Sequence, residues 1–322
     1  MAVVTGGFSA EREISILSGQ TVLKELVDSR IDAKEVRIDE TGWNVRLDGS
    51  AFPVNKRDMS WKDAQGNVRH FDLAFVCIHG HPGEDGHLQG YFHSIGLPVA
   101  GSNVFSSALT FNKAHSSSFA RTIGINVPAS VLYRKGSDWS NELADHMPYP
   151  LFVKPNRSGS SFGISRVTQE SDLLPAVEEA LIYDDLVIIE KGVKGRELAC
   201  GLSNHSGKAE VLELTEIIPK NAYFDYESKY SGGSAEITPA AVSDEVRAEI
   251  EKMSLRLYDH FELNGIARID YILDDTQKPW LIEINSIPGM SPESIIPKQV
   301  RAAGLNLAHI FEGIAKKCLK KE

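Results

Sequence analysis

Four polar residues stand at alternating positions of two apolar segments within 266–285. Arg268 and Asp270 belong to the first segment, Glu283 and Asn285 belong to the second, and the residues between them favour a turn. The alternation predicts the two strands of a hairpin. Because successive side chains of a strand point to opposite faces, Arg268 shares a face with Asp270, and Glu283 shares one with Asn285.

The expected register brings two carboxylates together. A turn centred between Thr276 and Gln277 pairs Asp270 with Glu283 and Arg268 with Asn285, so the carboxylates lie ~5 Å apart on one face. Uncompensated, one of them would take up a proton, whereas a divalent cation removes the conflict, and hard oxygen ligands suit Mg²⁺ completed by substrate phosphates. Arg268 can neutralise charge on a phosphate or a tetrahedral oxyanion. The alternative is a solvated polar face, but the flanking apolar residues would bury it.

Two further segments carry weaker signals of nucleotide binding. Lys154 ends a predicted strand and precedes a Gly/Ser loop at 157–163, whose backbone N–H groups can wrap phosphates. A plain surface turn explains this loop equally well, and no Gly-Lys-Ser/Thr opens a helix as in a Walker A motif. Glu190 and Lys191 end another apolar strand, with Glu197 soon after. Such acids can bind an adenine amino group or ribose hydroxyls, or they can simply end a strand.

Two loops are candidates for substrate contact. The segment 223–234 is aromatic and charged and ends in a glycine pair that can act as a hinge, which predicts a mobile lid that excludes water from the reaction; an ordinary surface loop is the alternative. The segment 79–87 contains three histidines, but their spacing matches no standard zinc pattern. Its glycines and proline suit a turn after the apolar run 73–78. We therefore expect a substrate-facing His79 rather than a metal site.

The composition narrows the class of protein. A chain of 322 residues predicts two or three domains. No apolar run reaches the ~18 residues of a membrane helix, and the N-terminal segment lacks a signal-peptide pattern. Cys77, Cys200 and Cys318 form no CxxC pair and suit a reducing compartment, and the net charge of −10 disfavours a nucleic-acid partner. We expect a cytoplasmic enzyme with neither a membrane nor a nucleic-acid partner.

The order of elements predicts an α/β chain in three parts. In the first hundred residues, short apolar strands lead into Gly turns and helices, which predicts a parallel sheet with 6–11 and 79–85 at its ligand-binding edge. The parts are an N-terminal α/β domain at 1–101, a central subdomain at 102–189, and a C-terminal subdomain at 190–322 with a lid loop at 219–238. The expected helices are 9–27, 88–95, 106–123, 170–180, 243–261 and one at the C-terminus, and the expected strands include 98–101, 150–155, 186–190, 197–202 and 210–216.

Taken together, these segments resemble the D-alanine–D-alanine ligases, members of the ATP-grasp superfamily. The likeness runs from Gly6 to about Leu307 and rests on the order and spacing of five motifs. They are GGFSAEREIS at 6–15, HGHPGEDGHLQG at 79–90, KPNRSGSSFG at 154–163, YFDYESKY at 223–230, and ARID…EIN…PGMSPES at 267–294. The resemblance implies an ATP-grasp fold, α+β in its C-terminal part, with ATP held between the central and C-terminal domains.

The resemblance also implies a role for each matching residue. The ATP-binding positions are Lys113, Phe152, Lys154, Glu190, Lys191, Val193, Glu197 and Ile272; Ile282 matches a further adenine contact, although strand alternation would turn it away from Glu283. Two Mg²⁺ ions, or Mn²⁺, would be held by Asp270, Glu283 and Asn285. Glu11 and His79 match the residues that hold the first D-alanine. Ser160 and Tyr230 match a pair that hydrogen-bonds with Glu11 to close the lid, and Lys229 matches the lysine that contacts the transferred phosphate. Arg268 and the backbone of Gly289 match the oxyanion site, and Ser294 with the backbone of Ile295 matches the site for the carboxylate of the second D-alanine.

The implied activity is ATP-dependent ligation of two D-alanines through an acyl phosphate, supplying peptidoglycan precursors in a bacterium, by a homodimer. Ser158 and the pair at 292–293 depart from some relatives, and the second departure borders the acceptor site. Tyr230 favours D-alanine as the acceptor over D-lactate or D-serine. Two alternatives stay open: another ATP-grasp carboxylate–amine or depsipeptide ligase, and a nucleotide-binding regulator without turnover, which the intact hairpin set disfavours.

Overall fold

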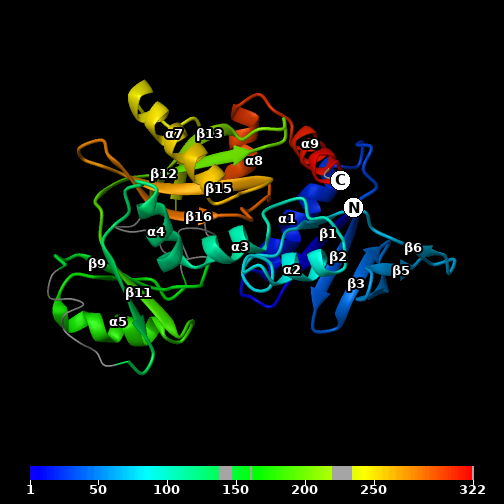
Figure 1. The fold of residues 1–322 in the computed structure, drawn as a ribbon, viewed down its shortest axis with the longest axis horizontal. Coiled ribbons are helices and arrows are strands. Elements are labelled where there is room, and N and C mark those ends of the chain that lie inside the picture. The colour runs from blue at the N-terminus through cyan, green and yellow to red at the C-terminus, as the bar shows by residue number, and fades with distance from the viewer. Residues whose placement is uncertain (138–146, 160–161, 220–233, 321–322) are drawn as a thin grey trace.

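The computed structural model describes residues 1–137, 147–159, 162–219 and 234–320. Three β-sheets with helices packed against them make up this part of the chain. Figure 1 shows the N-terminal sheet in blue at the right, the central sheet in green at the lower left, and the C-terminal sheet along the top. The mixed α/β class that the sequence predicts is confirmed.

The N-terminal sheet has seven strands in the order β6-β5-β4-β3-β2-β1-β7. Strand β1 pairs in parallel with both β2 and β7, as predicted, whereas β3 to β6 continue the sheet as an antiparallel meander that was not predicted. The short turns between those strands permit antiparallel pairing only, since a parallel crossover needs a dozen or more residues. The strands are β1 (Ala2–Gly6), β2 (Lys34–Asp39), β3 (Gly42–Leu47), β4 (Ser50–Asn55), β5 (Ser60–Lys62), β6 (Val68–Arg69) and β7 (Ala74–Val76).

Helices cover both faces of this sheet. Side chains of α1 (Arg12–Glu25) pack with Val3 on one face, and side chains of α2 (His87–Ser94) pack with Val4 on the other. The strand predicted at 98–101 was wrong, because only a single bridge joins Ala74 to Val99. The proline at 98 lacks the N–H that a longer ladder needs.

The helix predicted at 106–123 is two helices, α3 (Val104–Phe111) and α4 (Lys113–Thr122). They meet at Asn112, whose backbone is extended and whose side chain accepts a hydrogen bond from His115 N–H. An asparagine that caps the second helix ends the first, because a capping residue is itself non-helical. The break puts Lys113 at the start of α4.

The central sheet is antiparallel, in the order β10-β9-β11-β8. The helix α5 (Leu173–Ala180), preceded by a 3₁₀ turn at Glu170–Asp172, packs on one face against Leu151, Val153 and Ile189. Strand alternation therefore turns the side chains of 152, 154, 188 and 190 to the opposite face. The strands are β8 (Ser130–Arg134), β9 (Leu151–Pro155), β10 (Ser165–Val167) and β11 (Leu186–Lys191), which confirms those predicted at 150–155 and 186–190.

The C-terminal sheet is also antiparallel, in the order β14-β13-β12-β15-β16. The helix α7 (Asp244–His260) covers one face, where it shares a core with Ile269 and Tyr271. Within the lid loop predicted at 219–238, β13 continues to residue 219 and residues 234–237 form β14, which the prediction missed; residues 220–233 lie outside the described residues. The strands are β12 (Gly195–Ser203), β13 (Glu210–Pro219), β14 (Ser234–Ile237), β15 (Ile266–Asp274) and β16 (Pro279–Asn285).

The helix α8 (Ile295–Ala302) packs on the other face of this sheet. Gln299 donates to the backbone carbonyl of Ala199 at 2.9 Å. A Cβ atom at position 201 would lie 2.0 Å from the Gln299 amide oxygen, so Gly201 is what lets α8 approach the strand.

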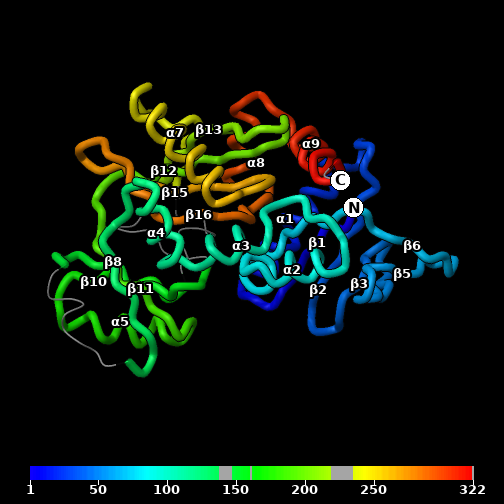
Figure 2. The backbone as a smooth tube through the Cα atoms, in the orientation of Figure 1, coloured from blue at the N-terminus to red at the C-terminus, as the bar shows by residue number. Residues whose placement is uncertain are grey.

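The last helix, α9 (Leu307–Leu319), returns to the N-terminal domain. Phe311 and Ile314 share one apolar cluster with Val3 and Val22, and Figure 2 shows the red end of the chain beside the blue one. The C-terminal part is thereby packed directly on the first sheet. The domain boundaries at 101/102 and 189/190 stay a prediction.

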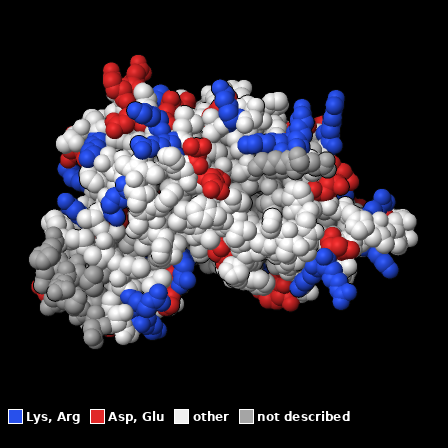
Figure 3. Space-filling model, in the orientation of Figure 1, with Lys and Arg blue, Asp and Glu red and all other residues white. Residues whose placement is uncertain are grey.

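The described surface carries charges of both signs. On the face drawn in Figure 3, lysine and arginine side chains interleave with aspartate and glutamate. No helix among the described residues combines the length and apolar character that crossing a membrane requires.

Candidate active site

The hairpin β15–β16 has the predicted register at its polar end. Asp270 lies opposite Glu283, and Arg268 lies opposite Asn285. A bulge follows, because Tyr271 pairs with residue 281 rather than 282. Ile282 is thus the extra residue of the bulge. It is half-buried next to half-buried Glu283, whereas residues 281 and 284 are buried in the core, so strict alternation does not hold at Ile282 and its adenine contact stays a prediction.

Cations offset the two opposed carboxylates. The Arg268 guanidinium donates to both oxygens of Asp270 at 2.7–3.2 Å and lies 3.9 Å from Glu283, whose other oxygen is 3.6 Å from Lys113 Nζ. Asn285 donates to Asp270 at 3.1 Å. Burial opposes the charge on Arg268, but these carboxylates outweigh it and raise the pKa of the guanidinium. Two like charges ~5 Å apart repel by about 3 kcal/mol at an effective dielectric constant of 20, so this compensation is needed.

These side chains form one wall of a cavity of about 560 Å³. The cavity is bounded by the N-terminal domain, the start of α4, the Gly/Ser loop and the loop before α8. It brings together eleven residues that the sequence singled out: Glu11, His79, Lys113, Glu197, Arg268, Asp270, Glu283, Asn285, Gly289, Ser294 and Ile295.

The N-terminal domain presents Glu11 and His79 to this cavity. A Cβ atom at Gly159 would lie 2.5 Å from the Glu11 carboxylate, so this acid closely approaches the phosphate-loop candidate. The hydroxyl of Ser18 lies 3.5 Å from His79 Nε2 and accepts a hydrogen bond from Met290 N–H at 3.1 Å. Burial lowers the pKa of His79, with Glu11 opposing the shift, so the imidazole is neutral at pH 7. Sequence reasoning missed Ser18. The one signal for it is that a polar serine stands on the buried face of α1, near Ile16 and Val22.

Lys113 joins two walls of the cavity. Its ammonium donates to the carbonyl of Ser158 at 2.7 Å in addition to its contact with Glu283. The side chain is only 12% exposed. Because α4 begins at Lys113, its position depends on the Asn112 cap.

The remaining ATP candidates lie on strands of the central and C-terminal sheets. Phe152 is the cross-strand partner of Glu190, and Ile272 is that of Glu197. Lys154 Nζ is 3.0 Å from the Glu190 carboxylate, and both side chains are 7% exposed. Lys154 and Glu190, which the resemblance assigns to different parts of ATP, thus form an ion pair with each other in this structure.

Lys191 and Val193 are separated from the main cavity. They line a second cavity of about 640 Å³ together with Trp280. Ser160, Lys229 and Tyr230 lie outside the described residues, so their roles stay predictions.

The loop before α8 forms the far end of the main cavity. Ser294 precedes the helix as its N-cap residue, yet its hydroxyl contacts Ser291 Oγ at 2.7 Å and makes no cap bond. Glu236 of β14 also lines this end and pairs with Lys298 of α8 at 3.1 Å. Sequence reasoning missed Glu236, because it placed that residue in the lid loop.

The comparisons with known proteins cover nearly the whole chain. Residues 1–102 match the family model described as D-ala D-ala ligase N-terminus, and residues 119–316 match that of the C-terminus. The chain is 39% identical over 316 residues to the D-alanine–D-alanine ligase of Phocaeicola vulgatus, covering 98% of this chain and 97% of the relative.

Solved structures agree with this likeness. The VanG D-Ala:D-Ser ligase of Enterococcus faecalis superposes with a TM-score of 0.86 at 29% identity and 98% coverage of both chains. D-alanyl-alanine synthetase A of Vibrio cholerae gives 0.89 at 27% identity, covering 99% of this chain and 97% of that one. D-alanine–D-alanine ligase of Bacillus anthracis complexed with ATP gives 0.78 at 26% identity, covering 99% and 96%.

A second acid of the cavity, Glu84, was also not predicted. Glu84 lies on the cavity wall and accepts a hydrogen bond from Gly80 N–H at 2.7 Å. Desolvation, together with repulsion from Glu11, raises the pKa of Glu84 from 4.5 to about 8. The folded chain therefore holds this proton more tightly than the unfolded chain does.

This raised pKa predicts a stability that depends on pH. The stabilisation is complete below the unfolded pKa of 4.5 and is lost as the pH rises through about 8. Glu84→Gln cannot titrate but retains an oxygen for Gly80 N–H. We expect the urea midpoint of the wild type to fall relative to that of Glu84→Gln between about pH 5 and pH 9. If the difference in urea midpoint between the wild type and Glu84→Gln did not change with pH, the raised pKa of Glu84 would be contradicted.

Proposed function

The chain belongs to the D-alanine–D-alanine ligase family, and from that premise we propose that it joins two D-alanines into D-alanyl-D-alanine with ATP. The single observation that carries the proposal is the convergence of Glu11, His79, Arg268 and Ser294 on the cavity that also contains the opposed carboxylates. The product would serve peptidoglycan synthesis. Free Cys77, Cys200 and Cys318 support the cytoplasm as its place of action, and the homodimer stays a prediction.

The reaction has two steps. The carboxylate of the first D-alanine attacks the terminal phosphorus of ATP, so ADP leaves and an acyl phosphate forms. The amine of the second D-alanine then attacks the acyl carbon, loses a proton, and expels phosphate from the tetrahedral intermediate. Such phosphoryl chemistry depends mainly on positioning and on neutralising charge.

Each wall of the cavity supports one part of this scheme. The Glu11 carboxylate suits the ammonium of the first D-alanine, with neutral His79 beside it. Arg268, kept charged by its carboxylate neighbours, suits the oxyanion, together with the backbone N–H of Gly289. Ser294 and the backbone of Ile295 begin a helix, and a helix N-terminus favours the carboxylate of the second D-alanine.

The nucleotide would lie between the central and C-terminal sheets. Lys113 and Lys154 suit its phosphates, and Glu190 and Glu197 suit the adenine amino group and the ribose. Lys154 and Glu190 would each have to give up their mutual ion pair to contact the nucleotide. Until ATP binds, that buried ion pair balances the charge of both side chains. Phe152 and Ile272 supply apolar walls, and half-buried Ile282 of the bulge supports a third.

The donor set of the hairpin fits a hard divalent cation. Asp270, Glu283 and Asn285 are two carboxylates and an amide at neighbouring register positions, and Mg²⁺ prefers such oxygen ligands. A bound Mg²⁺ would neutralise and orient the phosphates of ATP. Arg268 and Lys113 would balance the same carboxylates when the cation is absent.

A direct assay tests the proposed function. We expect ADP release and dipeptide formation with ATP, Mg²⁺ and D-alanine, and neither with L-alanine. In competition with D-alanine, D-lactate or D-serine should be used less. If one of them were the preferred acceptor, the proposal of D-alanine as the second substrate would be wrong. ATP binding without ADP release for any amino acid would indicate a nucleotide-binding regulator.

The hairpin carboxylates predict a change in magnesium dependence. Glu283→Gln should raise the Mg²⁺ concentration needed for half-maximal ADP release by about tenfold or more, since even outer-shell ligand partners are worth ~10–100-fold. The matched control is Asp275→Asn in the turn of the same hairpin, where the carboxylate pairs only with exposed Lys194 at 3.4 Å among the described contacts. Equal magnesium curves for the two variants would refute the metal assignment.

The acceptor site predicts a separation between binding and stability. Ser294→Ala should raise the KM for the second D-alanine and leave the urea midpoint near that of the wild type, because the hydroxyl makes no cap bond. Ser243 caps α7 by accepting from Val246 N–H at 3.4 Å. Ser243→Ala should do the reverse, with a loss of about 1 kcal/mol of stability. A lowered midpoint with an unchanged KM in Ser294→Ala would assign that residue a structural role.

A further inference from the structure

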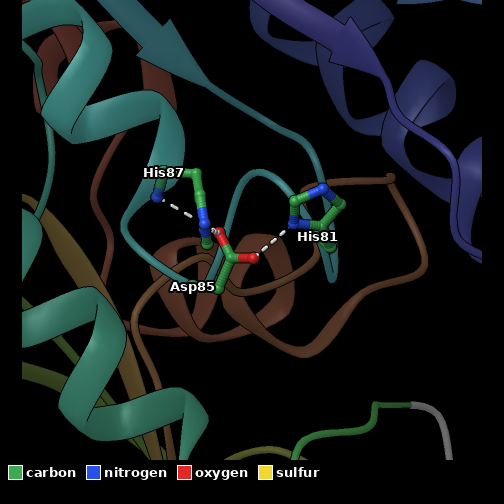
Figure 4. A group of neighbouring side chains, drawn as sticks. All are labelled: His81, Asp85 and His87. Atoms are coloured by element: carbon green, nitrogen blue, oxygen red, sulfur yellow. Dashed lines mark hydrogen bonds and ion pairs between the residues drawn. The ribbon is translucent and has the colours of Figure 1, made fainter.

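The turn between β7 and α2 carries a group of ligand-type side chains that the proposed reaction does not use. His81 Nδ1 lies 2.5 Å from one oxygen of Asp85, and His87 Nδ1 lies 2.9 Å from the other. Figure 4 shows both rings directed at the same carboxylate. The three ligand atoms lie within 4.8 Å of one another, and no other such group of His, Cys, Asp or Glu occurs in the part of the chain that the structure describes.

The backbone of this turn is held by contacts besides the hydrogen bond of 3.2 Å that the Asp85 carboxylate accepts from His87 N–H. Glu84 N–H donates to the carbonyl of Gly80 at 2.9 Å, and Leu88 N–H donates to that of Pro82 at 3.1 Å. The Glu84 carboxylate accepts from Gly80 N–H on the cavity side. Ligands presented on a fixed backbone lose little freedom on binding, which favours a preformed site.

The group is open to solvent, and its chemistry differs from that of the hairpin. The His81 and His87 side chains are 60% and 69% exposed, and that of Asp85 is 15% exposed. Two imidazoles and one carboxylate are a donor set typical of Zn²⁺ with water in the open position, and imidazole is a poor ligand for Mg²⁺. The two rings contact different oxygens of the one Asp85 carboxylate, and their centroids are 5.1 Å apart, so a single ion can contact all three side chains.

We propose that His81, Asp85 and His87 bind one divalent transition-metal ion of the Zn²⁺ class, with water completing its coordination. The sequence pattern alone did not indicate this site, because the 81/85/87 spacing matches no standard zinc motif. The turn makes the site by folding these positions onto one side, while His79 and Glu84 face the cavity from the other. A bound ion would therefore brace the turn that presents His79 and Glu84, without entering the cavity.

Metal binding by variants with matched controls tests this site. The full chain, made without a histidine tag and kept in excess Mg²⁺ to fill the hairpin site, competes for Zn²⁺ against a chromophoric chelator. We expect one equivalent bound by the wild type and by His93→Ala, whose ring is exposed on α2 but outside the group. His81→Ala and His87→Ala should each bind at least tenfold more weakly, and the double variant should bind none.

A second measurement separates a metal site from a carboxylate that merely links two imidazoles. Zn²⁺ should raise the thermal midpoint of the wild type and of His93→Ala, and leave that of the double variant unchanged, because only a ligand of the folded state shifts the midpoint. The double variant should unfold cooperatively near the wild-type temperature without metal. Wild type that binds no Zn²⁺ under competition, or a double variant that binds as the wild type does, would overturn the proposal.

Discussion

The opposition of Asp270 and Glu283 on one face of a half-buried hairpin is the constraint on which the site depends. Two carboxylates in register need positive charge nearby, and the chain supplies it from two directions. Arg268 comes from the same strand, whereas Lys113 comes from the start of a helix over 150 residues away. The site is therefore charge-balanced only when α4 and the hairpin are both in place.

Two polar contacts and one close packing contact bring the parts of the chain to this hairpin. Ser18 connects His79 of the first domain to the backbone of Met290 before α8. Lys113 connects the Gly/Ser loop to Glu283. Gly201 lets α8 lie close to β12, which places the helix N-terminus at the end of the cavity. Each of these contacts links segments that are remote in sequence, so a substitution at one of them disturbs the arrangement of the cavity walls.

The places where prediction and structure differ share a physical cause. The break at Asn112 arises because a side-chain cap outweighed a continuous helical pattern. Strict alternation fails at Ile282 because a bulge shifted the pairing of β16 by one residue, which a sequence pattern cannot reveal. The strands between residues 42 and 69 were missed because the sheet continues beyond its parallel centre as an antiparallel meander.

The sequence by itself determined the pairing of Asp270 with Glu283, the mixed α/β class and, through five motifs, the family. Alternation and short turns are local properties, so local spacing is sufficient to predict them. Only the tertiary structure decided that Glu84 and Glu236 line the cavity, that Lys154 pairs with Glu190, and that a turn gathers two histidines around Asp85. Those contacts depend on how separate elements pack or how a turn folds, and no period or spacing along the chain encodes them.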